Sequence, residues 1–254
     1  MSNTPKTVHK AMHLLRQVTQ RPGATLGELA AAADVPTATA HRLLSALEAE
    51  DLVRTTDNHA YHLGSYCLVL GSTYLADIDL RTEARPVLER LVEETGETAH
   101  LGVLSGTSMV YVDKVDTSHP VRMYSRVGAV SPVYCTGMGK AILAWADDST
   151  MARIVDSGLE RRTPNTITDP ARLRAEMERT RDRGFSIDDI ENEDGIRCAG
   201  AAVLGADGLP LAAISVAGPA SRLPEARLYE IGDMVASAAQ ELSATFGYEK
   251  GHRR

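Results

Sequence analysis

The sequence predicts an α+β protein of two parts, a small helical N-terminal domain and a larger domain of strands and helices. Three observations support this prediction: helical spacing of apolar residues through 11–47, strand-like segments at 98–115 and 196–217, and a break at Gly64-Ser65. At 254 residues the chain is long enough for two hydrophobic cores. Strands in hairpins, with helices packed to one side, favour an α+β sheet over a doubly wound one.

The segment 24–49 predicts two short helices separated by a tight turn. The first begins near Leu26 and ends near Val35, because a residue before proline is pushed out of the α region. Thr37 is placed to cap the second helix, whose buried face follows the i, i+3, i+4, i+7 pattern. That face consists of Ala40, Leu43, Leu44 and Leu47. An upstream helix that ends at residues 21–23 completes a three-helix core.

The opposite face of the second helix carries small polar and basic side chains, which suit the major groove of DNA. Hydroxyl and guanidinium groups hydrogen-bond to base edges and phosphates. We expect DNA contacts from Thr37, Thr39, His41, Arg42 and Ser45. Downstream, residues 52–55 and 60–63 flank a polar tip and predict a hairpin. This hairpin is the wing of a winged helix-turn-helix, with Arg54 and Asn58 near the DNA backbone.

The alternative is a helical hairpin that only packs within the protein, and the charge of this region bears on it. Residues 1–65 carry six basic and six acidic side chains, whereas most DNA-binding domains are basic. A single domain of this kind would bind DNA weakly. We therefore expect a homodimer or a dimer of dimers on a roughly palindromic site in double-stranded DNA.

Composition limits what the rest of the chain does. The formal net charge of −7 arises beyond residue 65, which predicts an acidic body without a nucleic-acid surface. No stretch has the roughly 20 apolar residues of a membrane span, and we expect no N-terminal signal segment. The three cysteines are widely spaced and form no Cys-x-x-Cys pair. They predict reduced thiols, a cytoplasmic location and no bound metal or other cofactor.

The pattern divides the chain into a DNA-binding domain at 1–65, a linker helix at 66–80 and a second domain at 81–250. The linker is too apolar for a solvated spacer, so we expect it to bury against a partner subunit. The second domain is predicted to contain helices at 81–94, 139–146, 151–156, 171–183 and 224–246. Its predicted strands are 98–104, 109–115, 121–125, 196–204 and 211–217.

Four separate segments, in order along the chain, resemble the IclR family of bacterial transcriptional regulators. They are LLSALEAEDLV at 43–53, YCTGMGKAILA at 134–144, GFSIDDIENEDGIRCAGAAVL at 184–204 and LAAISVAGP at 211–219. The resemblance implies a winged helix-turn-helix, a linker helix and a GAF-like effector-binding domain. It also implies a dimeric or tetrameric regulator, more often a repressor, whose operator binding responds to a small carboxylic or sugar acid.

The resemblance further implies an effector pocket. Gly137 and Met138 lie in a glycine-rich turn at a helix start, where close backbone approach and free amides favour an anion such as a carboxylate. The other positions that carry over are Met123, Asp188, Ile196, Cys198 and Ser215, with Arg126 expected nearby. Ala217 stands where some relatives place a second serine, which disfavours the smallest keto acids.

Three other interpretations of these residues are weaker. The glycine-rich turn lacks the P-loop register, because Ala141 follows Lys140 in place of serine or threonine. The acidic run 188–194 lacks the register of a calcium loop, which favours a solvated loop without metal. The alternative function is an enzyme with a DNA-binding appendage and a nucleophilic Cys135 or Cys198 beside His100. No catalytic signature surrounds either cysteine, so we do not expect an enzyme.

Overall fold

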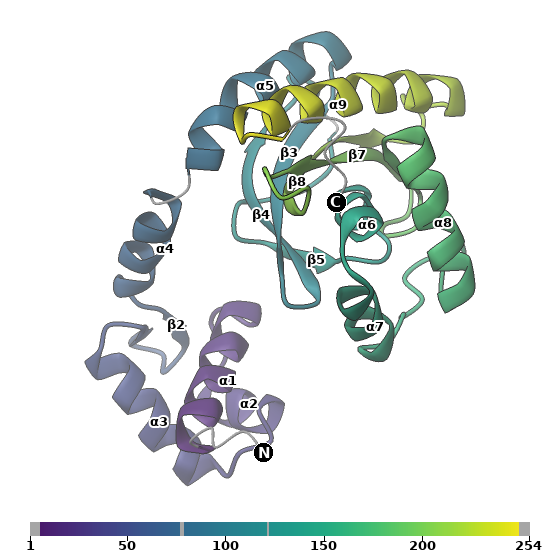
Figure 1. The fold of residues 1–254 in the computed structure, drawn as a ribbon. Helices are drawn as coiled ribbons and strands as arrows, with labels where there is room; N and C mark the ends of the chain where they lie inside the picture. Colours follow the sequence, from purple (N-terminus) through teal and green to yellow (C-terminus); the bar gives the residue numbers. More distant parts are fainter. Residues whose placement is uncertain (1–5, 77–78, 121, 249–254) are drawn as a thin grey trace. The chain divides into compact units, whose positions relative to one another are not determined.

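A computed structural model describes residues 6–76, 79–120 and 122–248, which belong to two compact units, Met1–Ile78 and Asp79–Arg254. The first unit begins with three helices (Figure 1). These are α1 (Lys6–Gln20), α2 (Leu26–Ala32) and α3 (Thr37–Ala49). The strands β1 (Val53–Thr55) and β2 (Tyr61–Leu63) form an antiparallel hairpin, and α4 (Tyr66–Ala76) follows.

The core of the first unit is formed by the apolar faces that helical spacing predicts. Its fully buried members include Leu14 and Val18 of α1, Leu29 of α2, and Ala40 and Leu44 of α3. The wing hairpin is fastened to this core by backbone bonds. The amide of Tyr61 donates to the carbonyl of Ala24, and the amide of Gly23 donates to the carbonyl of Tyr61, each at 2.9 Å.

Thr37 does not cap α3, contrary to the prediction from sequence. Pro36 occupies the N-cap position and Thr37 is already the first helical residue. The Pro36 carbonyl accepts from the amides of Thr39 and Ala40 at 2.8 and 2.9 Å. The helix thus starts one residue too early for the Thr37 hydroxyl to act as the cap, because a cap residue precedes the first helical turn.

The helix α4 is mostly apolar, and residues 66 and 68–73 are exposed in the chain, whereas Cys67 is half-buried. Leu68 is 77% exposed, and Val69 and Leu70 are about half exposed. Exposure of consecutive large apolar side chains is unusual for a monomer and typical of a contact surface.

The second unit is organised around one six-stranded sheet in the order β5-β4-β3-β8-β7-β6. All neighbouring strands are antiparallel. The strands are β3 (Thr98–Ser105), β4 (Ser108–Val115), β5 (Val130–Pro132), β6 (Ser186–Asp189), β7 (Ile196–Leu204) and β8 (Pro210–Pro219).

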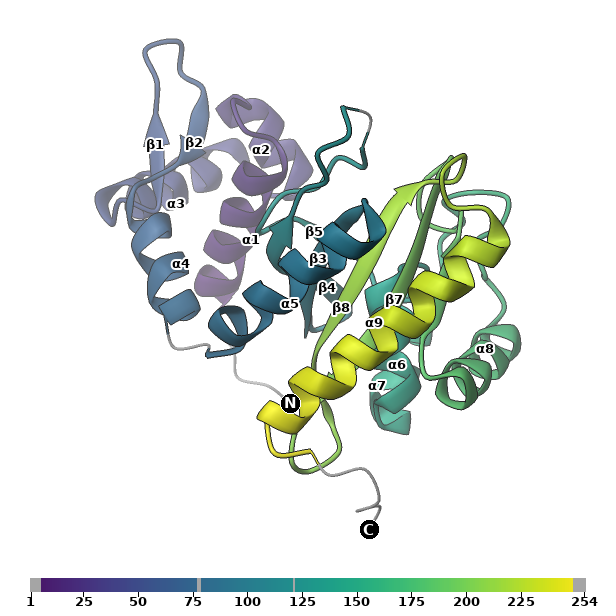
Figure 2. The ribbon, with the colours of Figure 1, turned by 90° about the horizontal axis from the view of Figure 1, so that it is seen from above.

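Helices cover both faces of this sheet, whereas the sequence predicted them on one side. The helices α5 (Asp79–Thr95) and α9 (Glu225–Thr245) lie on one face (Figure 2). The helix α6 (Gly137–Trp145) packs on the other face, with α7 (Asp148–Asp156) and α8 (Pro170–Arg183) outside it. Both faces are buried because the central strands are apolar on both sides: every side chain from Ala212 to Gly218 of β8 is buried.

Two predictions about strands were wrong. Residues 122–126 form no strand, and Val121 lies outside the described residues. The Ser125 hydroxyl and carbonyl are instead bound by the side chains of His100 and Lys114, and the edge strand forms later, at β5. Conversely, the start of the acidic run belongs to the strand β6, because Ser186–Asp189 pair with β7. None of the described helices is both long and apolar enough to span a membrane.

Candidate functional site

The outward face of α3 presents the polar side chains that the sequence predicted for DNA contact. Thr37, His41, Arg42 and Ser45 are exposed, and Thr39 is half-buried. Their exposure follows from the helical period, because Ala40, Leu44 and Leu47 turn the other face into the core. The arrangement leaves hydroxyl, imidazole and guanidinium groups free to meet an anionic partner.

The tip of the wing is shaped by local side-chain bonds. The Thr56 hydroxyl donates to the carbonyl oxygen of the Asn58 side chain at 2.5 Å, and His59 adopts a left-handed conformation with φ of 59°. The side-chain oxygen of Asn58 therefore helps to shape the turn. Arg54 is exposed on β1.

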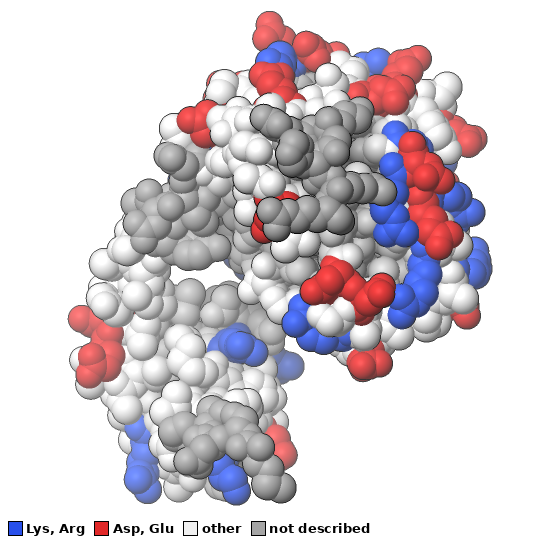
Figure 3. Space-filling model, in the orientation of Figure 1, with Lys and Arg blue, Asp and Glu red and all other residues white. Residues whose placement is uncertain are grey.

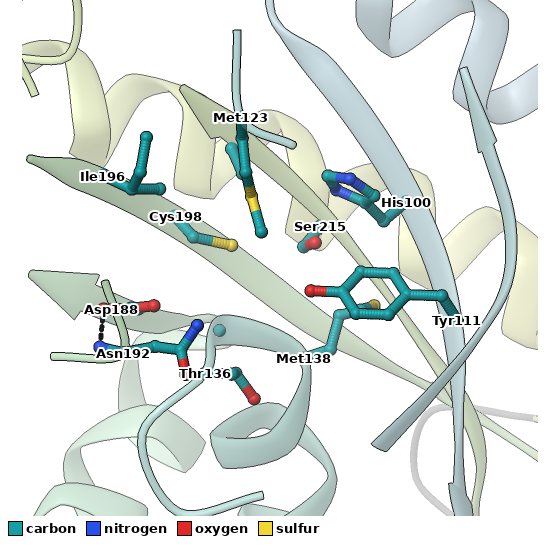
Figure 4. A pocket seen from close by; sticks show the side chains of 12 residues that line it. His100, Tyr111, Met123, Thr136, Met138, Asp188, Asn192, Ile196, Cys198 and Ser215 are labelled. Carbon is teal, nitrogen blue, oxygen red and sulfur yellow. Dashed lines mark hydrogen bonds between the residues drawn. The ribbon is translucent and has the colours of Figure 1, made fainter. Parts of the chain in front are cut away.

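A pocket in the second unit is where the structure brings together all seven residues expected to bind an effector (Figure 4). Met138 and Gly137 come from the start of α6, Ser215 from β8, and Cys198 from β7. The full lining is His100, Tyr111, Met123, Thr136, Gly137, Met138, Asp188, Asn192, Ile196, Cys198, Ser215 and Ala217. Arg126, expected nearby, is exposed and does not line it.

Two glycines allow the N-terminus of α6 to lie directly against the sheet. A Cβ on Gly137 would come within 2.6 Å of the Cys198 sulfur, and one on Gly200 within 2.6 Å of the Gly137 carbonyl carbon. Any side chain at either position would push the helix away from β7. Thr136 caps the helix: its hydroxyl accepts from the Gly139 amide at 3.2 Å. The cap satisfies the third amide of α6, and the two residues before it, Gly137 and Met138, line the pocket.

Asp188 is a buried carboxylate at the floor of the pocket. Its Oδ1 accepts from the Glu191 amide at 2.7 Å and from the Asn192 amide at 3.4 Å (Figure 4). Burial raises the pKa of Asp188 to about 7, although Lys140 and these amides act in the opposite direction. Near neutral pH the group can thus either accept or donate a hydrogen bond.

The turn that carries Asn192 is held from outside by a second loop. The hydroxyl groups of Thr163 and Thr166 donate to the carbonyls of Ile190 and Glu191, each at 2.6 Å. The guanidinium of Arg162 donates to the Asn192 carbonyl at 3.1 Å. These bonds fix a turn in which Ile190 has a φ of 57°, an uncommon conformation for a β-branched residue.

Two further polar residues, His100 and Tyr111, form the side of the pocket opposite Asp188 (Figure 4). The His100 ring lies edge-on to Tyr111 and shares a 2.8 Å hydrogen bond with the Ser125 hydroxyl. Burial lowers the pKa of His100 to about 4 and raises the pKa of Tyr111 to about 12, so both are neutral. Neither residue was predicted to line the effector pocket, and the only signal in the sequence was a polar side chain within a buried strand.

No arginine or lysine is among the described residues that line the pocket. Lys140 on α6 is fully buried and is paired with Glu191. Glu191 and Asp188 are only 6% and 4% exposed, so this part of the acidic run is not the solvated loop that was predicted. The remaining room in the pocket is about 10 Å³, space for roughly one water molecule.

The two cysteines proposed for an alternative enzyme have the wrong protonation state. Burial raises the pKa of both Cys135 and Cys198 to about 12, whereas a nucleophilic thiol needs a lowered pKa. The His100 ring is bonded to Ser125 and not to a sulfur. Within the described residues, no group of three or more His, Cys, Asp or Glu side chains is arranged to hold a metal ion.

Comparisons with known proteins agree with this architecture. Residues 7–57 match the model of the IclR helix-turn-helix domain, and residues 72–244 match that of the bacterial transcriptional regulator IclR C-terminal domain. The HTH-type transcriptional regulator BhcR of Paracoccus denitrificans is 35% identical over 94% of this chain and 86% of its own length. The transcriptional repressor IclR of Escherichia coli is 33% identical over 95% of this chain and 90% of its own length.

A solved structure extends the similarity to the whole fold. The IclR structure from Thermotoga maritima superposes with a TM-score of 0.71 at 32% identity, and covers 96% of this chain and 99% of that one. Both family models match in the expected order, and the second alone spans well over half of the chain. This protein therefore belongs to the IclR family of transcriptional regulators.

Proposed function

We propose that this protein is a DNA-binding repressor that acts as a homodimer and whose operator affinity is set by a small organic acid. The observation that carries the proposal is the pairing of two features in one chain. One is the polar outward face of α3 on a helix-turn-helix core, and the other is the pocket at the start of α6. A curated relative of similar length is a transcriptional repressor.

The DNA-binding half of the proposal predicts a loss of affinity in Arg42→Ala. The exposed guanidinium would contact a base edge or phosphate, and a good bidentate contact contributes roughly 1–3 kcal/mol per site. We expect at least tenfold weaker binding to DNA from the promoter next to the protein's own gene, measured by fluorescence anisotropy. Arg16→Ala, which removes the same charge from the exposed face of α1, is the matched control. Equal affinities of parent and Arg42→Ala would contradict the assignment of α3.

The chemistry of the pocket supports a small acid that also carries a hydroxyl group. A carboxylate can accept from the Met138 amide and the Ser215 hydroxyl, and the ligand hydroxyl can donate to Asp188. Without a lysine or arginine in the lining, a multiply charged anion would lose hydration without compensation. The small remaining room means that the pocket must widen when such a ligand enters.

A direct binding screen tests the effector. Hydroxy acids, keto acids, sugar acids and hydroxybenzoates are titrated against the full chain by isothermal calorimetry, and binders are added to the operator complex. We expect one class to bind saturably and to change operator affinity, and Ser215→Ala to weaken that binding. Ser72→Ala, on the exposed part of α4, is the control. If the protein binds its operator but none of these acids, the proposed organic-acid effector is wrong, whereas the proposed repressor function still stands.

A further inference from the structure

A second and larger cavity lies at the edge of the sheet, away from the effector pocket. Its volume is about 710 Å³, within the range of small-molecule sites. It shares no lining residue with the effector pocket. The walls come from the end of α6, the end of α8, the outer part of β7 and the second half of α9.

The cavity arises from the strand pairing and from small side chains. The edge strand β6 pairs with β7 only from Arg197 to Gly200, so none of the described strands adjoins the remainder of β7 on that side. The chain instead leaves α8 at Gly184, which has a left-handed φ of 87°. The positions of β7 and α9 that line this space are mainly alanines, which leave it unfilled. They are Ala201, Ala202, Ala236, Ala239 and Ala244.

Aromatic side chains and one arginine give the cavity its chemical character. Trp145 at the end of α6 and Tyr248 beyond α9 both line it. The Arg181 guanidinium donates to the carbonyl of Ala144, the residue before Trp145, at 2.8 Å. The guanidinium of Arg183 already has partners within the protein, because it donates to the Glu176 carboxylate and to the Phe185 carbonyl. Within the described part of the chain, Arg181 forms no ion pair with a carboxylate.

The surrounding charge limits the ligand to a single negative charge. Acidic and basic side chains alternate over α8 (Figure 3), and Asp182 also lines the cavity. One unpaired guanidinium beside one carboxylate suits a monoanion better than a dianion. The apolar walls and the two rings suit a flat hydrophobic body.

We propose that this cavity is a second ligand site, which binds an amphipathic aromatic monocarboxylate with its ring between Trp145 and Tyr248 and its carboxylate on Arg181. The site is independent of the effector pocket.

The probe for the test is 2-naphthoate, with the neutral 2-naphthalenemethanol as its uncharged counterpart. Binding to the full chain is followed by quenching of Trp145, the single tryptophan, and by calorimetry. We expect saturable binding of 2-naphthoate. Arg181→Gln should weaken it about tenfold and leave the affinity of the neutral alcohol unchanged. Arg179→Gln, an exposed arginine on the same helix whose partner is Glu176, should change neither.

A variant that fills the cavity with a larger side chain tests whether 2-naphthoate binds there and not elsewhere on the protein. Ala236→Leu places a larger side chain on the half-buried cavity face of α9 and should abolish binding, whereas Ala226→Leu, exposed on the same helix, should not. Ser215→Ala in the effector pocket should leave 2-naphthoate binding intact. No binding at millimolar 2-naphthoate, or binding that survives Ala236→Leu, would overturn the proposal. A change of molecular mass in Ala236→Leu, measured by light scattering, would also overturn the proposal, because it would show that the cavity face of α9 is a contact between copies of the chain.

Discussion

At the scale of single residues, Asp188 shows how a pocket residue acquires unusual chemistry from its position. Its carboxylate accepts backbone amides on one side and lies under the pocket on the other, where few solvent contacts remain. Burial raises its pKa to about 7, far above that of a free aspartate. The folded chain therefore holds a proton there that the unfolded chain releases near pH 4.

Asp188→Asn should change how stability depends on pH. The contribution of Asp188 to the free energy of unfolding of the parent should fall as pH rises from about 4 to about 7. Over this range the folded state binds more protons at Asp188 than the unfolded state does. The free energy of unfolding of Asp188→Asn minus that of the parent should therefore increase across this window. Urea titrations at pH 4.5, 5.5, 6.5 and 7.5 measure it. A constant difference would mean that Asp188 is ionised in the folded chain throughout.

Lys140 is the largest fully buried side chain that carries a charge, and its only ion-pair partner among the described residues is Glu191. The second carboxylate oxygen of Glu191 is buried without a hydrogen-bond partner in the same part of the chain. Removing the lysine would leave a buried carboxylate without compensation.

Lys140→Met should therefore destabilise the chain by roughly 3 kcal/mol or more, whereas Lys140→Met with Glu191→Leu should recover much of the loss. The double variant removes both charges and leaves an apolar contact of similar volume. Chemical unfolding of parent, single and double variants measures the effect. If the double variant were as unstable as the single, the pair would contribute by its shape rather than by its charges.

At the scale of elements, α4 has the apolar sequence of a buried helix, but its large apolar side chains are exposed in the single chain. Three consecutive residues, Leu68 to Leu70, expose about half or more of their surface. In the proposed homodimer, a second copy of the same helix would remove this area from water.

Leu68→Glu should shift the chain from dimer toward monomer, because it places a charge in the centre of that apolar surface. Light scattering coupled to size exclusion at micromolar concentration measures the mass. Leu209→Glu, at 52% exposure on the turn before β8, is the matched control and should leave the mass unchanged. A dimer that persists in Leu68→Glu would place the subunit contact elsewhere.

At the scale of the whole molecule, charge is distributed unevenly: residues 1–65 are neutral overall and the remainder carries the net charge of −7. The acidic remainder would be repelled by DNA, so few phosphate contacts are available to the chain. With Arg42 and Arg54 from each of two protomers, about four phosphates would be neutralised.

The slope of log affinity against log salt for operator binding should then be about −3.6. Arg54→Ala would remove one contact per protomer and reduce the slope by about 1.8. Titrations between 50 and 300 mM potassium chloride measure both values. An unchanged slope in Arg54→Ala would remove the wing arginine from the phosphate contacts.

Much of this arrangement could be predicted from sequence, because local patterns encode the elements. The helical spacing of Leu29, Ala40 and Leu44 placed the helix-turn-helix, and the segments around 98–115 and 196–217 placed the central hairpins. The seven effector-pocket residues came from a family resemblance, and the fold brings them into one pocket. Their role in binding stays a prediction.

The amino-acid sequence by itself determined the family, the helices, the central strands and the polar face of α3, because periodicity is a property of neighbours along the chain. It did not determine the edge strands β5 and β6. Only the tertiary structure decided which polar residues are buried. Asp188, His100 and Glu191 lie under other segments, and Ser125 is bound by His100 rather than by a strand neighbour. The cavity between α8 and α9 likewise depends on where β6 stops. Burial of a charge, and therefore its pKa, is set by residues distant in sequence, which no local pattern specifies.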